Sequence, residues 1–224
     1  MKLGVLLPTF RDNAEDALVV ANEVERAQLD GVFAYDHLWP MGSPERPSLA
    51  PFPVLARVAA QCPSLYVGPL VSRVGLFSTS KLVEQYVTLD TLAPGRVIAA
   101  LGTGDKLSAD ENMAYGLLYE SAATRRGLLQ ETIVALAPAI EVWCGAGSEK
   151  TNELARELGV ALNLWGASAA FVRDAASSGA VTWAGTLGDD PAALLDDLCA
   201  AGASWVVAAP PFQIEVLREW RQVR

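Results

Sequence analysis

The chain has 224 residues, of which 51% are hydrophobic and 19% are charged, and its net charge is −9. This composition indicates a globular protein with a substantial core. The acidic balance argues against nucleic acid as a partner, because phosphate backbones require a basic surface. The longest apolar runs are too short to cross a membrane. The cysteines, Cys62, Cys144 and Cys199, have neither zinc spacing nor a disulfide pattern, which favours a protein without a metal site in the reducing cytoplasm.

Short apolar runs alternate with longer helical patterns along the whole chain. The expected strands are 2–8, 31–35, 65–71, 96–101, 140–145, 160–165, 180–185 and 204–209. The expected helices are 14–29, 51–61, 79–92, 120–136, 149–158, 168–178, 190–201 and 211–223. Eight strand–helix pairs in strict order predict an α/β protein, a TIM (β/α)8 barrel that forms a single domain over residues 1–224. A doubly wound open sheet is the alternative.

Glycine occurs at most of the expected strand ends, where the active site of such a barrel gathers. The clearest cases are GTGD (102–105) and GAGS (145–148). Glycine there lets a flat or anionic ligand approach backbone N–H groups, although in any single loop it also suits a simple turn. GAGS precedes a helix, so that it is a candidate anion site, while Ser148 could equally be an ordinary N-cap.

Two titratable residues stand out at these strand ends. His37, the only histidine, lies beside Asp36 just after the second expected strand, where it could transfer a proton or pack in a loop. Asp105 closes GTGD, where it could act as an acid, a base or the start of an Asx turn. Trp39, Trp143, Trp165, Trp183 and Trp205 fall in or beside strands and could line a pocket or fill the core.

Five segments together resemble the luciferase-like monooxygenase family of flavin- and deazaflavin-dependent enzymes. They are LDGVFAYDHLWPMG, KLVEQYVTLDTLAPGRVIAALGTGD, ENMAYGLLYESAATRRGLLQE, IEVWCGAGSEKTNELARELGVALNLWG and WAGTLGDDPAALLDDLCAAGASWVV. The resemblance covers nearly the whole chain and implies a TIM barrel that holds coenzyme F-420 or FMN at the carboxyl ends of its strands. It also implies a homodimer.

The resemblance assigns roles to residues. His37 and Asp105 would lie by the reactive ring as catalytic residues, with Trp39 as the nearby aromatic residue and Asp105 where close relatives usually have glutamate. A non-prolyl cis peptide is expected within residues 68–71, behind the ring. The cofactor-binding residues that it implies are Asp36, Leu70, Val71, Ser72, Thr103, Gly104, Gly145, Ala146, Gly147 and Ser148.

The chain departs from the family in that the long insertion expected around the seventh unit is nearly absent. The function implied is an oxidoreductase or monooxygenase that acts on a small organic substrate by hydride transfer or by reduced-flavin oxygen chemistry. A non-catalytic flavin-binding protein is the alternative. A third reading, an isomerase or aldolase of sugar phosphates, would need a well-placed lysine, and Lys2, Lys81, Lys106 and Lys150 are poorly sited for it.

Overall fold

The computed structural model describes residues 1–211 and 213–224, with the backbone alone for Leu107. Its strands are β1 (Lys2–Leu6), β2 (Gly31–Ala34), β3 (Tyr66–Pro69), β4 (Ser72–Arg73), β5 (Ile98–Gly102), β6 (Glu141–Gly145), β7 (Ala161–Trp165), β8 (Val181–Gly185) and β9 (Trp205–Ala208). Its α-helices are α1 (Glu15–Arg26), α2 (Pro51–Gln61), α3 (Thr79–Leu92), α4 (Ala109–Ala114), α5 (Ala122–Leu136), α6 (Glu149–Glu157), α7 (Ala169–Ala176), α8 (Pro191–Ala200) and α9 (Ile214–Gln222), and a 3-10 turn, η1, covers Lys106–Ser108.

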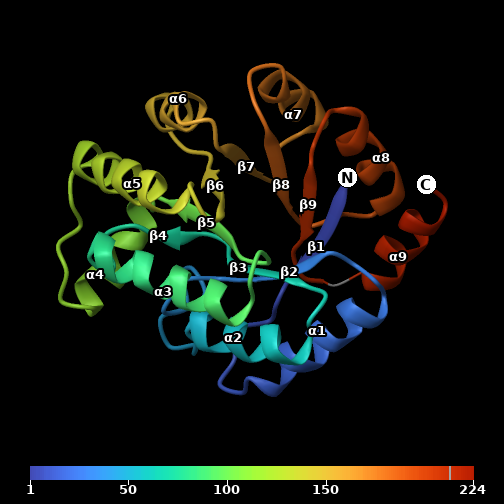
Figure 1. Cartoon of the computed structure of the whole chain (residues 1–224), viewed down its shortest axis with the longest axis horizontal. Coiled ribbons are helices and arrows are strands. Elements are labelled where there is room, and N and C mark those ends of the chain that lie inside the picture. The colour runs from blue at the N-terminus through green and yellow to red at the C-terminus, as the bar shows by residue number, and fades with distance from the viewer. Residues whose placement is uncertain (212) are drawn as a thin grey trace.

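The strands form one parallel sheet in the order β3-β2-β1-β9-β8-β7-β6-β5-β4, and the sheet closes on itself. Closure occurs where β4 pairs with β5 and where Val67 in β3 bridges Val97 just before β5. The helices surround this ring of strands (Figure 1). The closed ring confirms the predicted TIM barrel and rules out the open sheet.

The core has two parts, as a filled barrel requires. One lies between the strands and the helices and includes Leu3, Val5 and Leu101. The other lies inside the ring, where the rings of Phe33, Trp143 and Trp205 pack with centroids 5.2–5.7 Å apart. These aromatic side chains fill the barrel interior, so that ligand space is left at the carboxyl ends of the strands.

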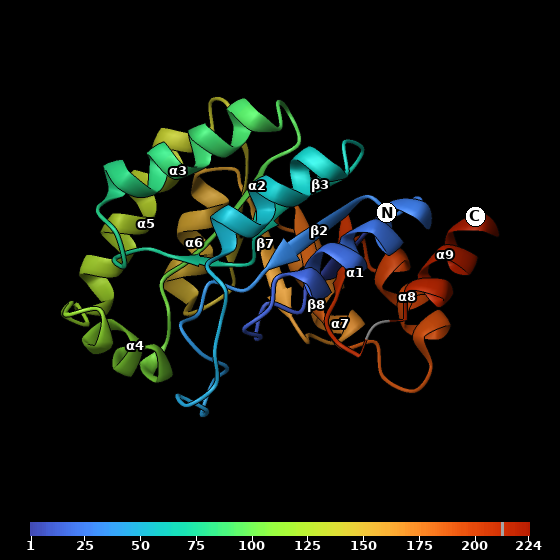
Figure 2. The same ribbon diagram turned by 90° about the horizontal axis from the view of Figure 1, so that it is seen from below.

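Two features differ from the expected elements. The third strand, expected over 65–71, is divided into β3 and β4 by a cis peptide between Leu70 and Val71, which confirms the expected non-prolyl cis bond. Between β5 and α5 the chain forms η1 and α4, which the sequence did not predict because the segment is short and polar. Figure 2 shows α4 and the loop after β2 projecting from the same end of the barrel.

The link between α7 and β8 is short, because α7 ends at Ala176 and β8 begins at Val181. The expected shortening of the family's insertion is therefore a feature of the fold. Of the helices in residues 1–211 and 213–224, none combines the length and the apolar character that a membrane crossing needs.

Candidate active site

A cavity of about 500 Å³ opens at the carboxyl ends of the strands. Of the candidate site residues, those that line it are His37, Leu70, Val71, Thr103, Gly104, Asp105, Gly145, Ala146 and Gly147. Phe10, Tyr35, Arg73 and Trp165 also line it. The strand exits that the sequence singled out therefore converge on one mouth.

His37 is held by a carboxylate that the sequence did not single out, that of Glu111 in α4. The imidazole Nδ1 lies 2.8 Å from Glu111 Oε1, and the Leu38 backbone N–H donates to Glu111 Oε2 over 3.1 Å. An ionised carboxylate only accepts hydrogen bonds, so that Nδ1 carries the hydrogen. Nε2, on the far side of the ring, is then the nitrogen left to exchange a proton with a bound ligand.

Arg73, at the end of β4, is the second partner of Glu111. Its NH2 group donates to Glu111 Oε2 over 2.6 Å, and its NH1 group donates to the Ser108 carbonyl over 3.2 Å. The Arg73 and Glu111 side chains are only 4% and 2% exposed. This buried ion pair ties α4 to the barrel and neutralises the arginine charge.

The charges of this cluster shift the pKa values of both neighbouring carboxyl groups. For Glu111, burial is the largest influence and raises the pKa, but the hydrogen bond and charge of His37 and the charge of Arg73 together lower it. For Asp36, burial raises the pKa against the opposing charge of Arg73, whose backbone N–H donates to Asp36 Oδ2 over 3.3 Å. Glu111 is thus the carboxylate that stays ionised beside the imidazole.

Asp105 lines the same cavity as His37, but its carboxylate faces the following turn. Asp105 Oδ1 accepts hydrogen bonds from the Ser108 backbone N–H and from Ser108 Oγ, each over 3.1 Å. Of the roles that the sequence allowed for Asp105, the structure therefore shows the Asx-type cap of the following turn. Asp105 lies at the rim of the cavity, while the carboxylate that contacts the imidazole is Glu111.

The other candidate residues do not line the cavity. The Ser72 hydroxyl is buried and accepts from Tyr86 Oη over 2.9 Å, on the side of α3. Ser148 precedes α6, and its hydroxyl lies 3.0 Å from Thr151 Oγ1. Trp39 is half-buried in the loop after β2, outside the lining set. Asp36 accepts a hydrogen bond from the Arg73 backbone N–H, as described above.

Two glycine-bearing strand exits lie against Val71 in the cavity. A Cβ added at Gly102 would lie 2.6 Å from Val71 Cγ2, and one added at Gly145 would lie 3.3 Å from Val71 Cγ1. Because both residues are glycine, their backbone packs directly on the Val71 side chain. In the GAGS loop the Ala146 N–H donates to the Asn163 carbonyl over 2.9 Å and the Gly147 N–H donates to Asn152 Oδ1 over 3.0 Å. Two amides of the candidate anion site are therefore already used.

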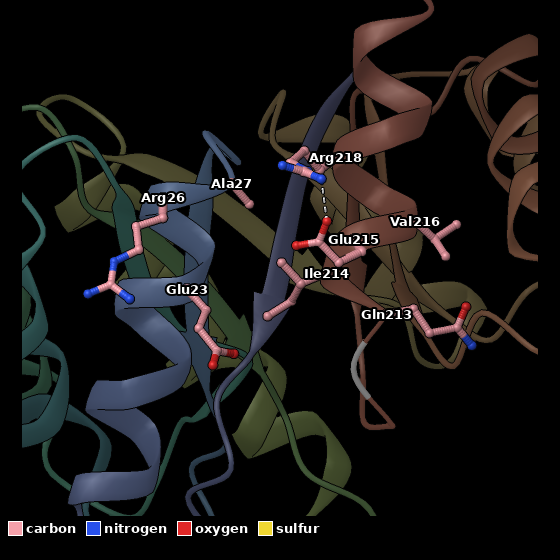
Figure 3. A pocket seen from close by; sticks show the side chains of 8 residues that line it. All are labelled: Glu23, Arg26, Ala27, Gln213, Ile214, Glu215, Val216 and Arg218. Atoms are coloured by element: carbon pink, nitrogen blue, oxygen red, sulfur yellow. Dashed lines mark ion pairs between the residues drawn. The ribbon is translucent and has the colours of Figure 1, made fainter.

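A second cavity, of about 600 Å³, lies on the outer surface between α1 and α9 (Figure 3). Glu23 and Arg26 of α1 line it, together with Glu215 and Arg218 of α9, which form an ion pair. None of the candidate residues lies there. In the part of the chain that the structure describes, no group of three or more His, Cys, Asp or Glu side chains could hold a metal ion.

Glu111 is the functional candidate that reasoning from the residues missed. It is in ENMAYG, within a segment that carried the family resemblance, but nothing in a polar six-residue helix marks one acidic side chain as buried. A signal was present in Arg73, because a strand-end arginine in a buried position requires a carboxylate partner. Its identity could be found only from the folded chain.

Comparison with known proteins gives relatives over most of the chain. The family model described as luciferase-like monooxygenase matches residues 1–185. The F420-dependent hydroxymycolic acid dehydrogenase of Mycobacterium tuberculosis is 30% identical over 107 residues, which are 47% of this chain and 30% of that protein. The F420-dependent glucose-6-phosphate dehydrogenase of Beutenbergia cavernae is 28% identical over 146 residues, 65% of this chain and 42% of that protein. The matched segments thus span less than half the length of these curated relatives.

A solved structure matches the fold over its whole length. It is an F420-dependent secondary alcohol dehydrogenase in complex with an F420-acetone adduct, with a TM-score of 0.82, 13% identity, and coverage of 100% of this chain and 99% of that chain. At this identity the likeness shows the barrel fold.

Proposed function

Because the chain belongs to the luciferase-like monooxygenase family, we propose that it is a coenzyme F-420-dependent dehydrogenase that oxidises an alcohol group of a small organic substrate to a carbonyl group. The observation that carries the proposal is the His37–Glu111 pair at the mouth of the barrel, beside the Leu70–Val71 peptide. Both curated relatives described above are F420-dependent dehydrogenases.

His37 is the proton acceptor in this proposal. The chemistry that the deazaflavin supplies when bound is acceptance of the hydride from the carbinol carbon. His37 Nε2 takes the hydroxyl proton, so that the alcohol loses one hydride and one proton and becomes a carbonyl compound. Glu111 keeps the hydrogen on Nδ1 and stabilises the imidazolium that forms, as the third member of a catalytic triad does.

The residues that would hold the cofactor surround Val71. The backbone of Leu70 and Val71, Thr103 and Gly104 after β5, and Gly145–Gly147 after β6 would hold the planar ring. Asp105 would contact the ring edge from the rim. FMN is the second candidate cofactor for the same residues, in which case reduced-flavin oxygen chemistry replaces hydride transfer from the alcohol.

Separate titrations of the protein with coenzyme F-420 and with FMN, followed by fluorescence, test the proposal. We expect micromolar binding of at least one of the two cofactors. When coenzyme F-420 is bound, we expect alcohols to reduce it.

His37→Ala should lower turnover by about 100-fold or more, the scale of a lost general base. Its cofactor affinity should stay within about twofold of the unchanged protein, because Leu70, Val71 and the glycine exits are intact. If neither cofactor binds at micromolar concentration, the redox assignment is wrong.

A non-catalytic flavin-binding protein is the second candidate. The observation that favours it is the short β7–α7 link, residues 166–168, because this link follows Trp165 at the mouth of the barrel and Trp165 is half-exposed. Tight cofactor binding without turnover of any alcohol, equal in the unchanged protein and in His37→Ala, would identify this function.

The proposal includes a homodimer in the cytoplasm. Its support is the family resemblance, together with the apolar side chains of Val87 and Leu92 on α3 and Val134 on α5, which are more than half exposed. All three cysteines are free thiols, as suits a reducing compartment. Light scattering should give twice the chain mass of 23.8 kDa, and a single chain mass at micromolar concentration would contradict the dimer.

A further inference from the structure

Three aromatic rings form a continuous wall in the cavity, which we call the aromatic wall: Phe10, Tyr35 and Trp165. Phe10 and Tyr35 are stacked, with centroids 4.5 Å apart and planes at 14°, and the Tyr35 and Trp165 centroids are 6.3 Å apart. Tyr35 follows β2 and Trp165 is the last residue of β7, and these two strands are four places apart in the order of the strands. The wall therefore crosses the mouth of the barrel.

Trp165 is 55% exposed although it lines a concave site. A large ring that remains open to solvent inside a cavity offers apolar area to a ligand rather than to the core. Burial raises the pKa of Tyr35 to about 12, so that its hydroxyl is protonated at neutral pH and the wall carries no charge.

The charged groups that line the cavity do not favour an anionic substrate. Among the described residues that line the cavity, Arg73 is the one arginine or lysine. Its charge is already neutralised by Glu111 in a buried ion pair. Asp105 adds a carboxylate at the rim. A phosphorylated substrate would therefore lose its hydration without gaining an unpaired cation, which costs binding free energy.

The aromatic wall adjoins the proposed proton acceptor. The Phe10 and His37 ring centroids are 6.4 Å apart. A ring or apolar chain that packs on the wall would thus place a hydroxyl on its adjoining carbon near the imidazole.

We propose that the aromatic wall of Phe10, Tyr35 and Trp165 is the substrate subsite and that it selects uncharged alcohols with an aromatic or apolar substituent over phosphorylated sugars. This inference rests on the proposed dehydrogenase function for the reaction, but the binding preference can be measured on the protein without cofactor.

Saturation-transfer NMR with 1-phenylethanol and with glucose 6-phosphate, on the protein alone, tests the preference. We expect binding of 1-phenylethanol and none of glucose 6-phosphate at the same concentration. Trp165→Ala should weaken 1-phenylethanol binding by about tenfold, the effect of losing one aromatic contact with its buried area, and Trp165→Phe should fall between. Phe171→Ala is the matched control, because Phe171 is 53% exposed on α7 outside the cavity lining, and it should change nothing.

Titration of the same variants with coenzyme F-420 separates this inference from the proposed function. Unchanged cofactor affinity in Trp165→Ala, with 1-phenylethanol binding weakened, supports the substrate subsite. If Trp165→Ala weakens cofactor binding and spares 1-phenylethanol, or if glucose 6-phosphate binds as well as 1-phenylethanol, the inference is wrong. If the unchanged protein binds 1-phenylethanol through Trp165 but binds neither coenzyme F-420 nor FMN, the subsite is supported and the dehydrogenase function fails.

Discussion

Replacement of Glu111 by alanine is expected to lower the free energy of unfolding by about 3–5 kcal/mol, the cost of leaving one member of a buried ion pair alone. The Arg73 guanidinium would keep its hydrogen bond to the Ser108 carbonyl but lose its only carboxylate contact among the described residues, in a position that is 4% exposed. Urea denaturation followed by circular dichroism measures the loss. In the double variant Arg73→Met/Glu111→Leu most of the stability should return, because both charges are removed. An unchanged midpoint for Glu111→Ala would contradict the buried pair.

The more conservative Glu111→Gln variant tests the link between this carboxylate and His37. Glutamine has the size of glutamate but no charge, so that it neither fixes the hydrogen on Nδ1 nor stabilises an imidazolium. We expect turnover to fall by at least about 100-fold, while the protein stays folded. A loss of turnover no larger than that of a surface variant would show that Glu111 serves the fold alone.

The pH dependence of stability gives an independent check on the same pair. The pKa of Glu111 is lower in the folded protein than its ordinary value of 4.5. A carboxyl group shifted in this direction stabilises the fold fully above its unfolded pKa, and that stabilisation is lost as the pH falls through the folded pKa. The difference in unfolding free energy between the unchanged protein and Glu111→Gln should therefore be constant near neutrality and shrink below about pH 4.5. A difference that grows in acid would contradict an ionised Glu111.

The secondary structure was largely predictable because most strands are mainly apolar and alternate with longer helical segments. The helices over 51–61 and 79–92 have the predicted bounds. Gly102 and Gly145, whose close approach to Val71 the structure shows, were visible as glycines at strand ends, and the cis peptide fell where the family resemblance placed it. These features depend on local sequence or on a shared motif.

The charge pairing in the site could not be predicted in the same way. Asp105 and Glu111 are both acidic residues after β5, and the family resemblance singled out Asp105 as the acidic residue by the reactive ring. The structure instead uses Asp105 as the cap of η1, and the capped turn leads into α4, which carries Glu111 to the imidazole. Which of the two carboxylates contacts His37 depends on the position of α4, and this helix is too short to show a hydrophobic periodicity in the sequence.

Gly68→Ala is expected to have the largest effect on folding. An ideal Cβ at Gly68 would lie 2.1 Å from the Ile98 carbonyl oxygen and 3.1 Å from the Ile98 carbonyl carbon. Both are backbone atoms of β5, so that relief requires β3 and β5 to move apart where the barrel closes through the Val67–Val97 bridge. We expect a loss of more than about 3 kcal/mol or failure to fold, since overpacking against backbone cannot be relieved by a rotamer change.

Two other glycines calibrate this prediction under the same denaturation assay. At Gly102 the added Cβ would meet the Val71 side chain, which can rotate, so that Gly102→Ala should cost less than Gly68→Ala. At Gly127, inside α5, the added Cβ would meet nothing within 4 Å, and alanine should stabilise the helix by about 0.5–1 kcal/mol. If β3 and β5 are closely packed where the barrel closes, Gly127→Ala should be the most stable of the three variants. Gly102→Ala should be intermediate and Gly68→Ala the least stable. If Gly68→Ala is as stable as Gly102→Ala, then β3 and β5 are farther apart than the Gly68–Ile98 distance indicates. Leu70 and Val71, which follow β3 and line the cavity, would then also lie elsewhere.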